Sequence, residues 1–171
     1  LINSVSEIVD KKLIGVLATQ TTVRSAYYKN VISSKKKNTK IFEQECPEFV
    51  SEIEKEKLNF QRINHLSDLY LRPLINKNIE ELILGCSHYP LIYDFLREKI
   101  DTNIKIIDPS ISLIKKFNKC FTISETDRYE SLSYENINFF VTSENDLFAK
   151  KVKFWFEINK EISLVNLGSN V

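Results

Sequence analysis

The sequence lacks several features that define large classes of proteins. It has no methionine, not even at position 1, which indicates a processed N-terminus or a piece of a longer protein. No apolar run reaches the roughly 18 residues of a membrane-spanning helix, and no signal peptide is visible. Its three cysteines form neither a disulfide framework nor a Cys-x-x-Cys zinc pair. We therefore expect a cytoplasmic protein without a membrane segment.

The chain also lacks an excess of either charge. Its 24 basic and 23 acidic residues leave a net charge of +1, which makes no electrostatic case for a nucleic-acid or anionic membrane partner. Apolar residues make up 43% of the 171, enough for a hydrophobic core. This length suits one ordinary domain, or two small lobes on one chain.

Short apolar runs alternate with helical patterns along the sequence. Residues 13–18 and 81–86 are the kind of run that forms a strand buried on both faces of a parallel sheet. The same patterns predict further strands at 40–43, 104–107, 139–141 and 163–165, and helices near 23–31, after Pro47, and near 62–75, 90–99, 111–117 and 146–156. This alternation predicts an α/β fold with a mostly parallel sheet flanked by helices.

Two predicted strands are followed by side chains able to bind or react, at the sheet edge where parallel folds bind ligands. Thr19 and Thr22 follow the first strand, and their hydroxyls can hold a carboxylate or cap the next helix. Cys86 and His88 follow the second strand, where an extended backbone would turn both side chains the same way. A helix beginning near Pro90 would lower the pKa of Cys86 and favour its thiolate.

Each of these residues also has a structural interpretation. A cysteine at the end of a buried strand is often a packed small residue, and a histidine there is often a structural hydrogen-bonding group. For Cys86 and His88 taken together, the functional and the structural interpretation balance. Gly85 favours the functional one, because a missing side chain lets a ligand approach the backbone. The remaining candidates are expected to be packing or surface residues: Cys46, Cys120 and His65. No metal site is predicted.

Four stretches of the chain resemble the motifs of glutamate racemases. They are IGVLATQTTVRS at residues 14–25, ECPEFV at 45–50, LILGCSHYPL at 82–91 and IDP at 107–109. The family usually has threonine at the position of Ser87, so the hydroxyl is kept. The cysteine of its Cys-Pro-x-Phe-Val motif, here Cys46, is not catalytic.

The resemblance implies a cofactor-independent enzyme that interconverts L-glutamate and D-glutamate for peptidoglycan synthesis. Members use two cysteines on opposite faces of the substrate α-carbon, because inversion needs a base on one face and an acid on the other. Cys86 would be one of the two, with His88 as its assisting acid. The substrate-binding hydroxyls implied are those of Thr19, Thr22 and Ser87.

The chain departs from the family in lacking the motifs of the other half-site. The Cys-Asn-Thr motif with the second cysteine and the Asp-Ser-Gly motif are both missing. We therefore expect one whole racemase lobe at residues 1–108 and the returning part of the second lobe at 109–171. Such a piece would have reduced activity or none by itself, and would expose apolar surface.

Three other functions stay open. One is another racemase of the superfamily, such as an aspartate racemase, although His88 favours the glutamate branch. Another is a non-catalytic remnant that binds small acids. A Cys-His hydrolase is the weakest, because the sequence identifies no acid to orient His88. Glutamate is the expected partner, and a homodimer is left open.

Overall fold

The computed structural model describes residues 9–120 and 137–168. The chain divides into two compact units, Leu1–Cys120 and Phe121–Val171. The first unit therefore includes helix α7 (Pro109–Cys120), which the sequence assigned to a second lobe. The predicted lobe boundary between residues 108 and 109 stays a prediction.

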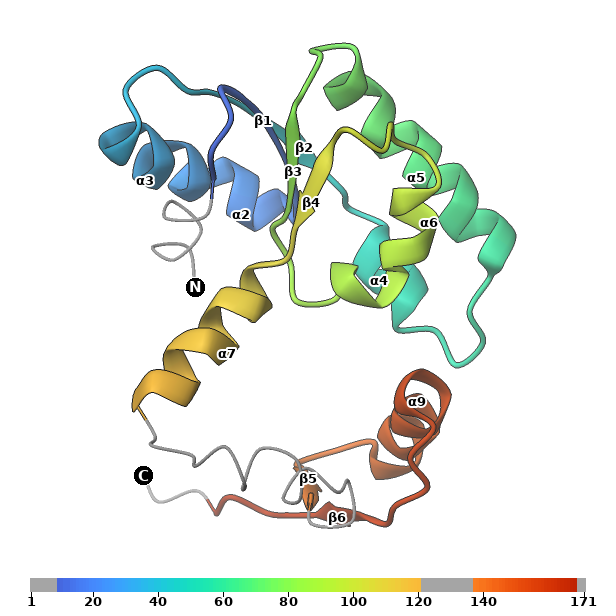
Figure 1. The fold of residues 1–171 in the computed structure, drawn as a ribbon. Coiled ribbons are helices and arrows are strands. Elements are labelled where there is room, and N and C mark those ends of the chain that lie inside the picture. Colours follow the sequence, from blue (N-terminus) through green and yellow to red (C-terminus); the bar gives the residue numbers. More distant parts are fainter. Residues whose placement is uncertain (1–8, 121–136, 169–171) are drawn as a thin grey trace. The chain divides into compact units, whose positions relative to one another are not determined.

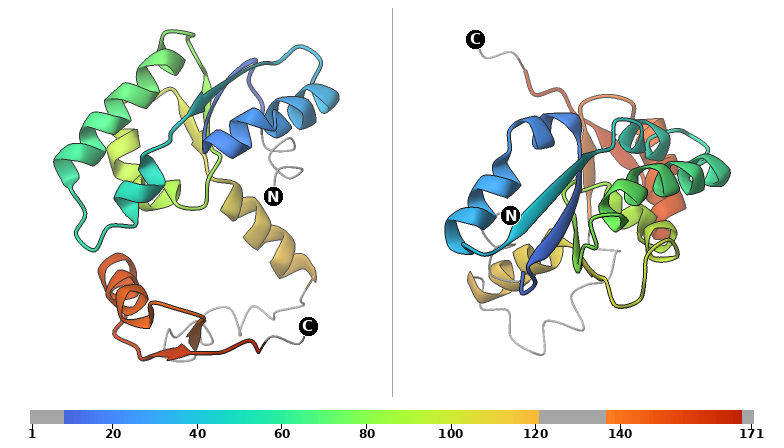
Figure 2. Two further views of the ribbon diagram at one scale, coloured as in Figure 1. Left: turned by 180° about the vertical axis from the view of Figure 1, so that it is seen from behind. Right: turned by 90° about the horizontal axis from the view of Figure 1, so that it is seen from above.

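A four-stranded parallel sheet forms the centre of the first unit, in the order β2-β1-β3-β4 (Figure 1). Its strands are β1 (Leu13–Ala18), β2 (Lys40–Glu45), β3 (Glu81–Leu84) and β4 (Lys105–Ile107). Helices α2 (Gln20–Arg24) and α3 (Tyr27–Lys35) lie on one face, and α4 (Phe49–Ile53), α5 (Phe60–Ile75) and α6 (Tyr93–Arg97) on the other (Figures 1 and 2). The predicted α/β class is confirmed.

The two inner strands, β1 and β3, carry the most apolar runs. All four residues of β3 are buried, and so are five of the six in β1. On the α3 side, Ile14, Val16 and Ala18 of β1 pack with Tyr28 and Ile32. A strand covered by helices on both faces has no solvated side, so its sequence shows no polar alternation.

Two predicted helices are divided in the structure. The helix expected near residues 23–31 is α2 and α3, separated at Ala26, whose φ of 49° is left-handed. The helix expected from Pro90 to Lys99 begins as the 3-10 helix η1 (Tyr89–Ile92) and continues as α6. In both cases the periodicity located the apolar face but not the break.

The second unit contains a parallel pair of strands and one helix. Strands β5 (Phe139–Val141) and β6 (Ile162–Leu164) pair directly, and α9 (Asn145–Phe156) packs on them. The buried residues Val152, Ile158 and Ile162 form its core. The strand and helix predicted here are confirmed, with β6 beginning one residue earlier than expected.

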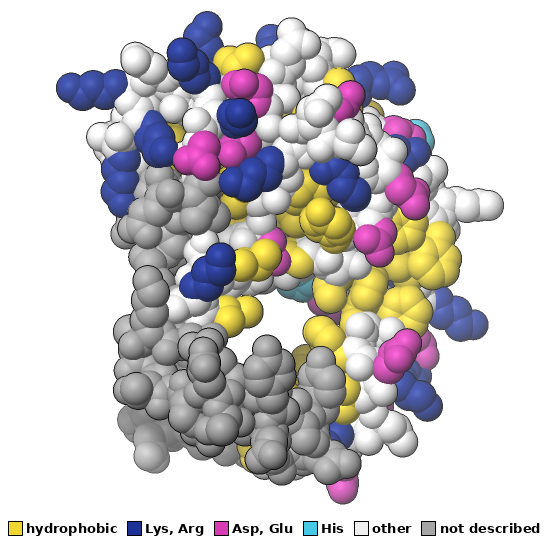
Figure 3. Space-filling view, viewed as in Figure 1, with side chains coloured by type: hydrophobic (Ala, Val, Ile, Leu, Met, Phe, Trp, Pro, Cys, Tyr) yellow, Lys and Arg dark blue, Asp and Glu magenta, His cyan; other side chains and the backbone are white. Residues whose placement is uncertain are grey.

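The surface of the first unit carries both signs of charge. On the face shown in Figure 3, lysine and arginine side chains are interspersed with aspartate and glutamate. No helix in the part of the chain that the structure describes is both long and apolar enough to span a bilayer.

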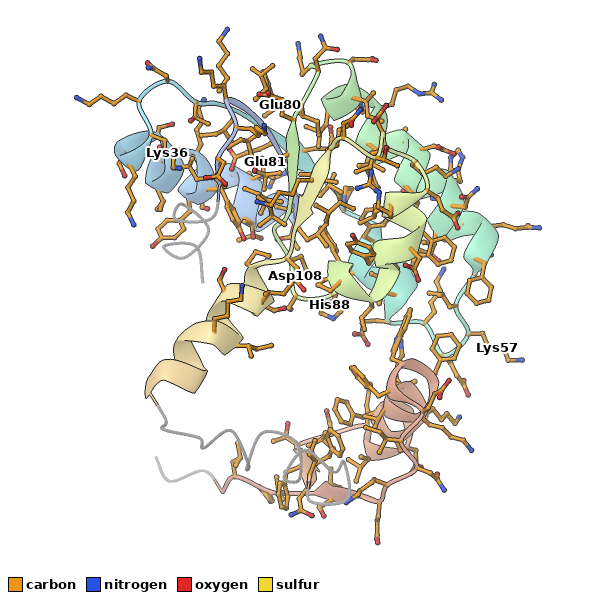
Figure 4. The ribbon with its side chains drawn as sticks, viewed as in Figure 1. Lys36, Lys57, Glu80, Glu81, His88 and Asp108 are labelled. Carbon is orange, nitrogen blue, oxygen red and sulfur yellow. The ribbon has the colours of Figure 1, made fainter. Side chains whose placement is uncertain are left out.

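Glu81, at the start of β3, is a buried carboxylate that fastens the beginning of β1. Its two oxygens accept the backbone N–H of Asp10 at 3.3 and 3.1 Å, and one also accepts that of Lys11 at 3.2 Å. Glu80 accepts the next two N–H groups, at Lys12 and Leu13 (Figure 4). These bonds tie β1 to β3 at the end of the sheet opposite Cys86.

We predict that Glu81→Gln destabilises the protein by about 2 kcal/mol, because charge-assisted bonds to backbone N–H groups are replaced at a site 1% exposed. Urea unfolding followed by circular dichroism measures the change. Glu98→Gln, at an exposed position, should stay within about 0.5 kcal/mol of the parent. Equal stability of the two variants would contradict the role given to Glu81.

Candidate active site

Three neighbouring strands end at the same edge of the sheet, and each end carries a candidate side chain. Thr19 follows β1 directly, and Cys86 lies two residues beyond the end of β3. Gly85 donates its N–H to the carbonyl of Leu17 at 2.7 Å, which continues the pairing of β1 with β3. The N–H of Cys46, just after β2, donates to the carbonyl of Ala18 at 2.9 Å. Residues from distant parts of the sequence are thereby aligned across the sheet.

Gly85 is required by packing within the protein. A Cβ at this position would lie 2.7 Å from the Leu17 carbonyl oxygen, 3.0 Å from the Cβ of Ala18 and 3.2 Å from the Tyr28 ring. The expectation that its missing side chain makes room for a ligand is therefore wrong. Residues of β1 and α3 fill the space beside Gly85. The missing side chain therefore permits the close approach of the ends of β1 and β3.

Cys86, His88 and Glu54 form a chain of polar contacts at this edge. The Cys86 Sγ lies 3.7 Å from His88 Nδ1, and His88 Nε2 lies 2.8 Å from Glu54 Oε1 (His88 is labelled in Figure 4). Sequence reasoning missed Glu54, which lies 34 positions away at the end of α4. The sequence identified no acid to orient His88, and the structure places Glu54 in that position.

This chain of contacts assigns a direction to the proton on His88. A carboxylate only accepts hydrogen bonds, so Glu54 favours a proton on Nε2. The lone pair of Nδ1 is then directed at the Cys86 thiol, in the geometry of a base beside its acid. The tautomer is inferred from this network, as histidine protons generally are.

The pKa of the Cys86 thiol is raised, in the direction opposite to the one predicted from the sequence. Burial is the largest cause, and hydrogen bonds from the backbone N–H groups of His88 and Tyr89 oppose it. The expected helix N-terminus is weaker than foreseen, because the chain after Cys86 enters the short helix η1 and not a full α-helix. Cys86 is half-buried, so it remains accessible to small molecules.

Thr19 is confirmed as the N-cap of α2. Its hydroxyl oxygen accepts the N–H of Thr22 at 3.4 Å and lies 2.9 Å from the Thr22 hydroxyl. The two hydroxyls therefore form one polar group next to the strand end that precedes Cys86. Capping uses only part of their hydrogen-bonding capacity. Ser87 is exposed, between Cys86 and His88.

The other candidates behave as structural or surface residues where they are described. Cys46 is 1% exposed, and burial, the largest cause, raises the pKa of its thiol to about 12. His65 is exposed on α5. The side chain of Cys120 lies outside the described residues. Across residues 9–120 and 137–168, no three His, Cys, Asp or Glu side chains are placed to hold a metal ion.

Glutamate racemases of known structure share this fold. A glutamate racemase from Francisella tularensis, in complex with D-glutamate, is 28% identical with a TM-score of 0.79, covering 98% of this chain and 63% of that one. A glutamate racemase from Bacillus anthracis, 22% identical with a TM-score of 0.77, shares the fold over 97% of this chain and 62% of that one.

Sequence comparison also finds glutamate racemases among the relatives of this chain. The glutamate racemase of Prochlorococcus marinus strain NATL1A is 40% identical over 168 residues, which are 98% of this chain and 63% of that protein. No family model matches the chain. The chain is homologous to glutamate racemases over nearly all of its length, and it spans just under two thirds of the length of these relatives.

We predict that Gly85→Ala costs about 2–3 kcal/mol, the cost of overpacking against backbone that cannot move away. Gly15→Ala is the matched control, because its Cβ would meet the ends of the Ile79 and Leu74 side chains, which can rotate. Urea unfolding should rank Gly85→Ala below Gly15→Ala, and the reverse order would contradict the packing role.

Alkylation of Cys86 should depend on pH in the direction set by its burial. The thiolate is the nucleophile, and a raised pKa leaves less thiolate at pH 7 than an exposed thiol has. Peptide mapping after iodoacetamide treatment should therefore give a rate for Cys86 that increases through a midpoint above 9.0, the unperturbed value. A midpoint below this value would show that the backbone N–H groups outweigh burial.

Proposed function

We propose that this chain supplies one half of a glutamate racemase active site, with Cys86 as one of two acid–base groups. The observation that carries the proposal is the contact chain from Cys86 through His88 to Glu54, at a strand end beside the Thr19 and Thr22 hydroxyls. The homology supports it, since the relatives described above are all glutamate racemases.

The reaction needs a base on one face of the substrate α-carbon and an acid on the other. The Cys86 thiolate removes the α-proton from its own face: the C–H bond breaks, its electron pair stays on carbon and an S–H bond forms. Protonation from the far face then gives the other enantiomer. In the reverse direction Cys86 is the acid that delivers the proton.

His88 and Glu54 assist this proton transfer. Once substrate is bound, the Nδ1 lone pair accepts the thiol proton of Cys86, and the carboxylate of Glu54 stabilises the imidazolium that results. A raised thiol pKa has two consequences. It makes the thiolate a stronger base toward the weakly acidic α-proton, and it makes help from His88 more necessary at neutral pH.

The developing carbanion must also be stabilised. We infer that hydroxyls of Thr19, Thr22 and Ser87 hold the substrate carboxylates, because hydrogen-bond donors around a carboxylate favour the electron-rich intermediate. The mechanism calls for no cofactor. The reaction would supply D-glutamate for peptidoglycan in the cytoplasm.

The acid–base group of the far face is not found among the described residues of this chain. Cys46 is buried in packing, and the side chain of Cys120 is not described. We infer that this group belongs to the part of glutamate racemases that the chain does not span, so that the chain alone has reduced activity or none. A non-catalytic module that binds small acids is the alternative favoured by this observation.

The test is loss of the α-proton signal of L-glutamate and of D-glutamate in D2O, followed by proton NMR with this chain. With Cys86 as sole base, one enantiomer should exchange and the optical rotation should not change. Cys86→Ala should slow the exchange at least about a hundredfold, in keeping with the loss of a general base. Cys46→Ala, the matched control, should retain it. An aspartate series run in parallel separates the two racemase classes.

Exchange that persists in Cys86→Ala would contradict the assignment of the base. If the chain shows no exchange at all, the part of the Prochlorococcus marinus relative that this chain does not span is added as a separate polypeptide. Racemisation restored by that segment supports the half-site. Continued absence of exchange favours the non-catalytic module.

A further inference from the structure

We propose that Phe49 is a positioning residue for this site, since it holds helix α4 in the place where Glu54 meets His88. The proposal rests on the function proposed above only in treating Cys86 and His88 as the reacting groups. The ring of Phe49 packs against Tyr70 and Tyr89. Phe49 acts through the helix that it begins.

The His88–Glu54 pair cannot hold its own geometry. The side chain of His88 is 31% exposed and that of Glu54 is 50% exposed. Ion pairs of this exposure contribute little, because water competes for both groups and two side chains must be ordered. A 2.8 Å contact between them therefore depends on a scaffold that brings α4 close to the strand end.

Phe49 provides the buried half of that scaffold. Its side chain is fully buried, and its ring lies edge-on to the ring of Tyr89, with centroids 5.3 Å apart and planes at 71°. Tyr89 is the residue after His88 in the chain. On the other side, the Phe49 ring meets Tyr70 of α5 at 5.0 Å and 83°. The three rings fix the start of α4 between α5 and the turn that carries His88.

Tyr89 is itself attached to the sheet. Its hydroxyl donates to the Cys46 carbonyl at 3.5 Å, and the Cys46 N–H bonds to the end of β1. Burial, the largest cause, raises the pKa of Tyr89, so the phenol stays protonated and remains a donor. The ring against which Phe49 packs is therefore fixed at both of its ends.

Helix α4 transmits this anchor to Glu54. The helix has five residues, and Glu54 is its C-cap, with its N–H bonded to the Val50 carbonyl at 2.9 Å. Ile53, next to Glu54, is 1% exposed. A helix this short rises only about 1.5 Å per residue and has no break in it. A shift at Phe49 is therefore carried to the carboxylate.

Glu48, just before α4, forms an ion pair with Arg62 and lies 3.5 Å from the Tyr70 hydroxyl. These contacts hold the start of α4 on its solvent-facing side.

A purely structural Phe49 would affect only the stability of the fold. A positioning Phe49 must in addition decide whether Glu54 acts on the site. A double-mutant cycle separates these two roles.

The measurement is the rate of Cys86 alkylation by iodoacetamide at pH 7.5, followed by peptide mapping, which needs no racemase activity. In the parent protein, Glu54→Gln should slow alkylation about threefold, the effect of losing one exposed ionic contact. In a Phe49→Leu background the same substitution should change the rate less than about 1.5-fold, because Glu54 has already left His88. Circular dichroism confirms that the variants are folded.

Phe60→Leu is the matched control background. Phe60 stacks on Phe95 at 5.9 Å and takes part in neither ring contact of Phe49, so the threefold effect of Glu54→Gln should persist there. If Phe49→Leu does not fold, Tyr70→Leu takes its place and should also abolish the effect.

Three results would overturn the proposal. These are an equal effect of Glu54→Gln with and without Phe49, no effect of Glu54→Gln in the parent, or loss of the effect in Phe60→Leu as well. If α-proton exchange is normal but the effect of Glu54→Gln does not depend on Phe49, only the positioning role is removed. A positive double-mutant cycle, with exchange that stays absent even after the relative's segment is added, would remove only the proposed function.

Discussion

The close approach of β3 to β1 at Gly85 is the contact on which the site depends. A residue with a side chain would meet the Leu17 carbonyl and Tyr28, so only glycine lets the strands pair to their ends. That pairing places Cys86 beside Thr19. At the other end of the same strands, the buried carboxylate of Glu81 binds the N–H groups before β1. The two ends together determine the register, and hence which side chains share the edge.

The reactive edge is built from three segments that are far apart in the sequence. Two strand ends bring the Thr19–Thr22 hydroxyls and the Cys86–His88 pair, and α4 brings Glu54. The strand ends are held by backbone hydrogen bonds, which are rigid. Glu54 is held by a short helix whose position depends on aromatic packing. The acid is therefore the member of the group whose place is most open to change.

The two cysteines at this edge differ in how deeply they are buried. Cys46 is almost completely enclosed, with a pKa raised to about 12, so its thiol is unreactive at neutral pH. Cys86 is only half-buried and has two backbone N–H groups and an imidazole beside its sulfur. A cysteine after a strand end is thus a packing residue at position 46 and a candidate base at position 86.

The sequence by itself determined the α/β class, the inner strands and the candidates Cys86, His88, Thr19 and Thr22. Each depends on local pattern: apolar runs, helix periodicity and short motifs. Tertiary structure alone decided that Gly85 serves packing, that Glu54 meets His88 and that burial raises the pKa of Cys86. These depend on distances between segments separated by tens of residues and on the solvent that packing excludes. No local pattern encodes such quantities, because they arise only when the strands and helices assemble.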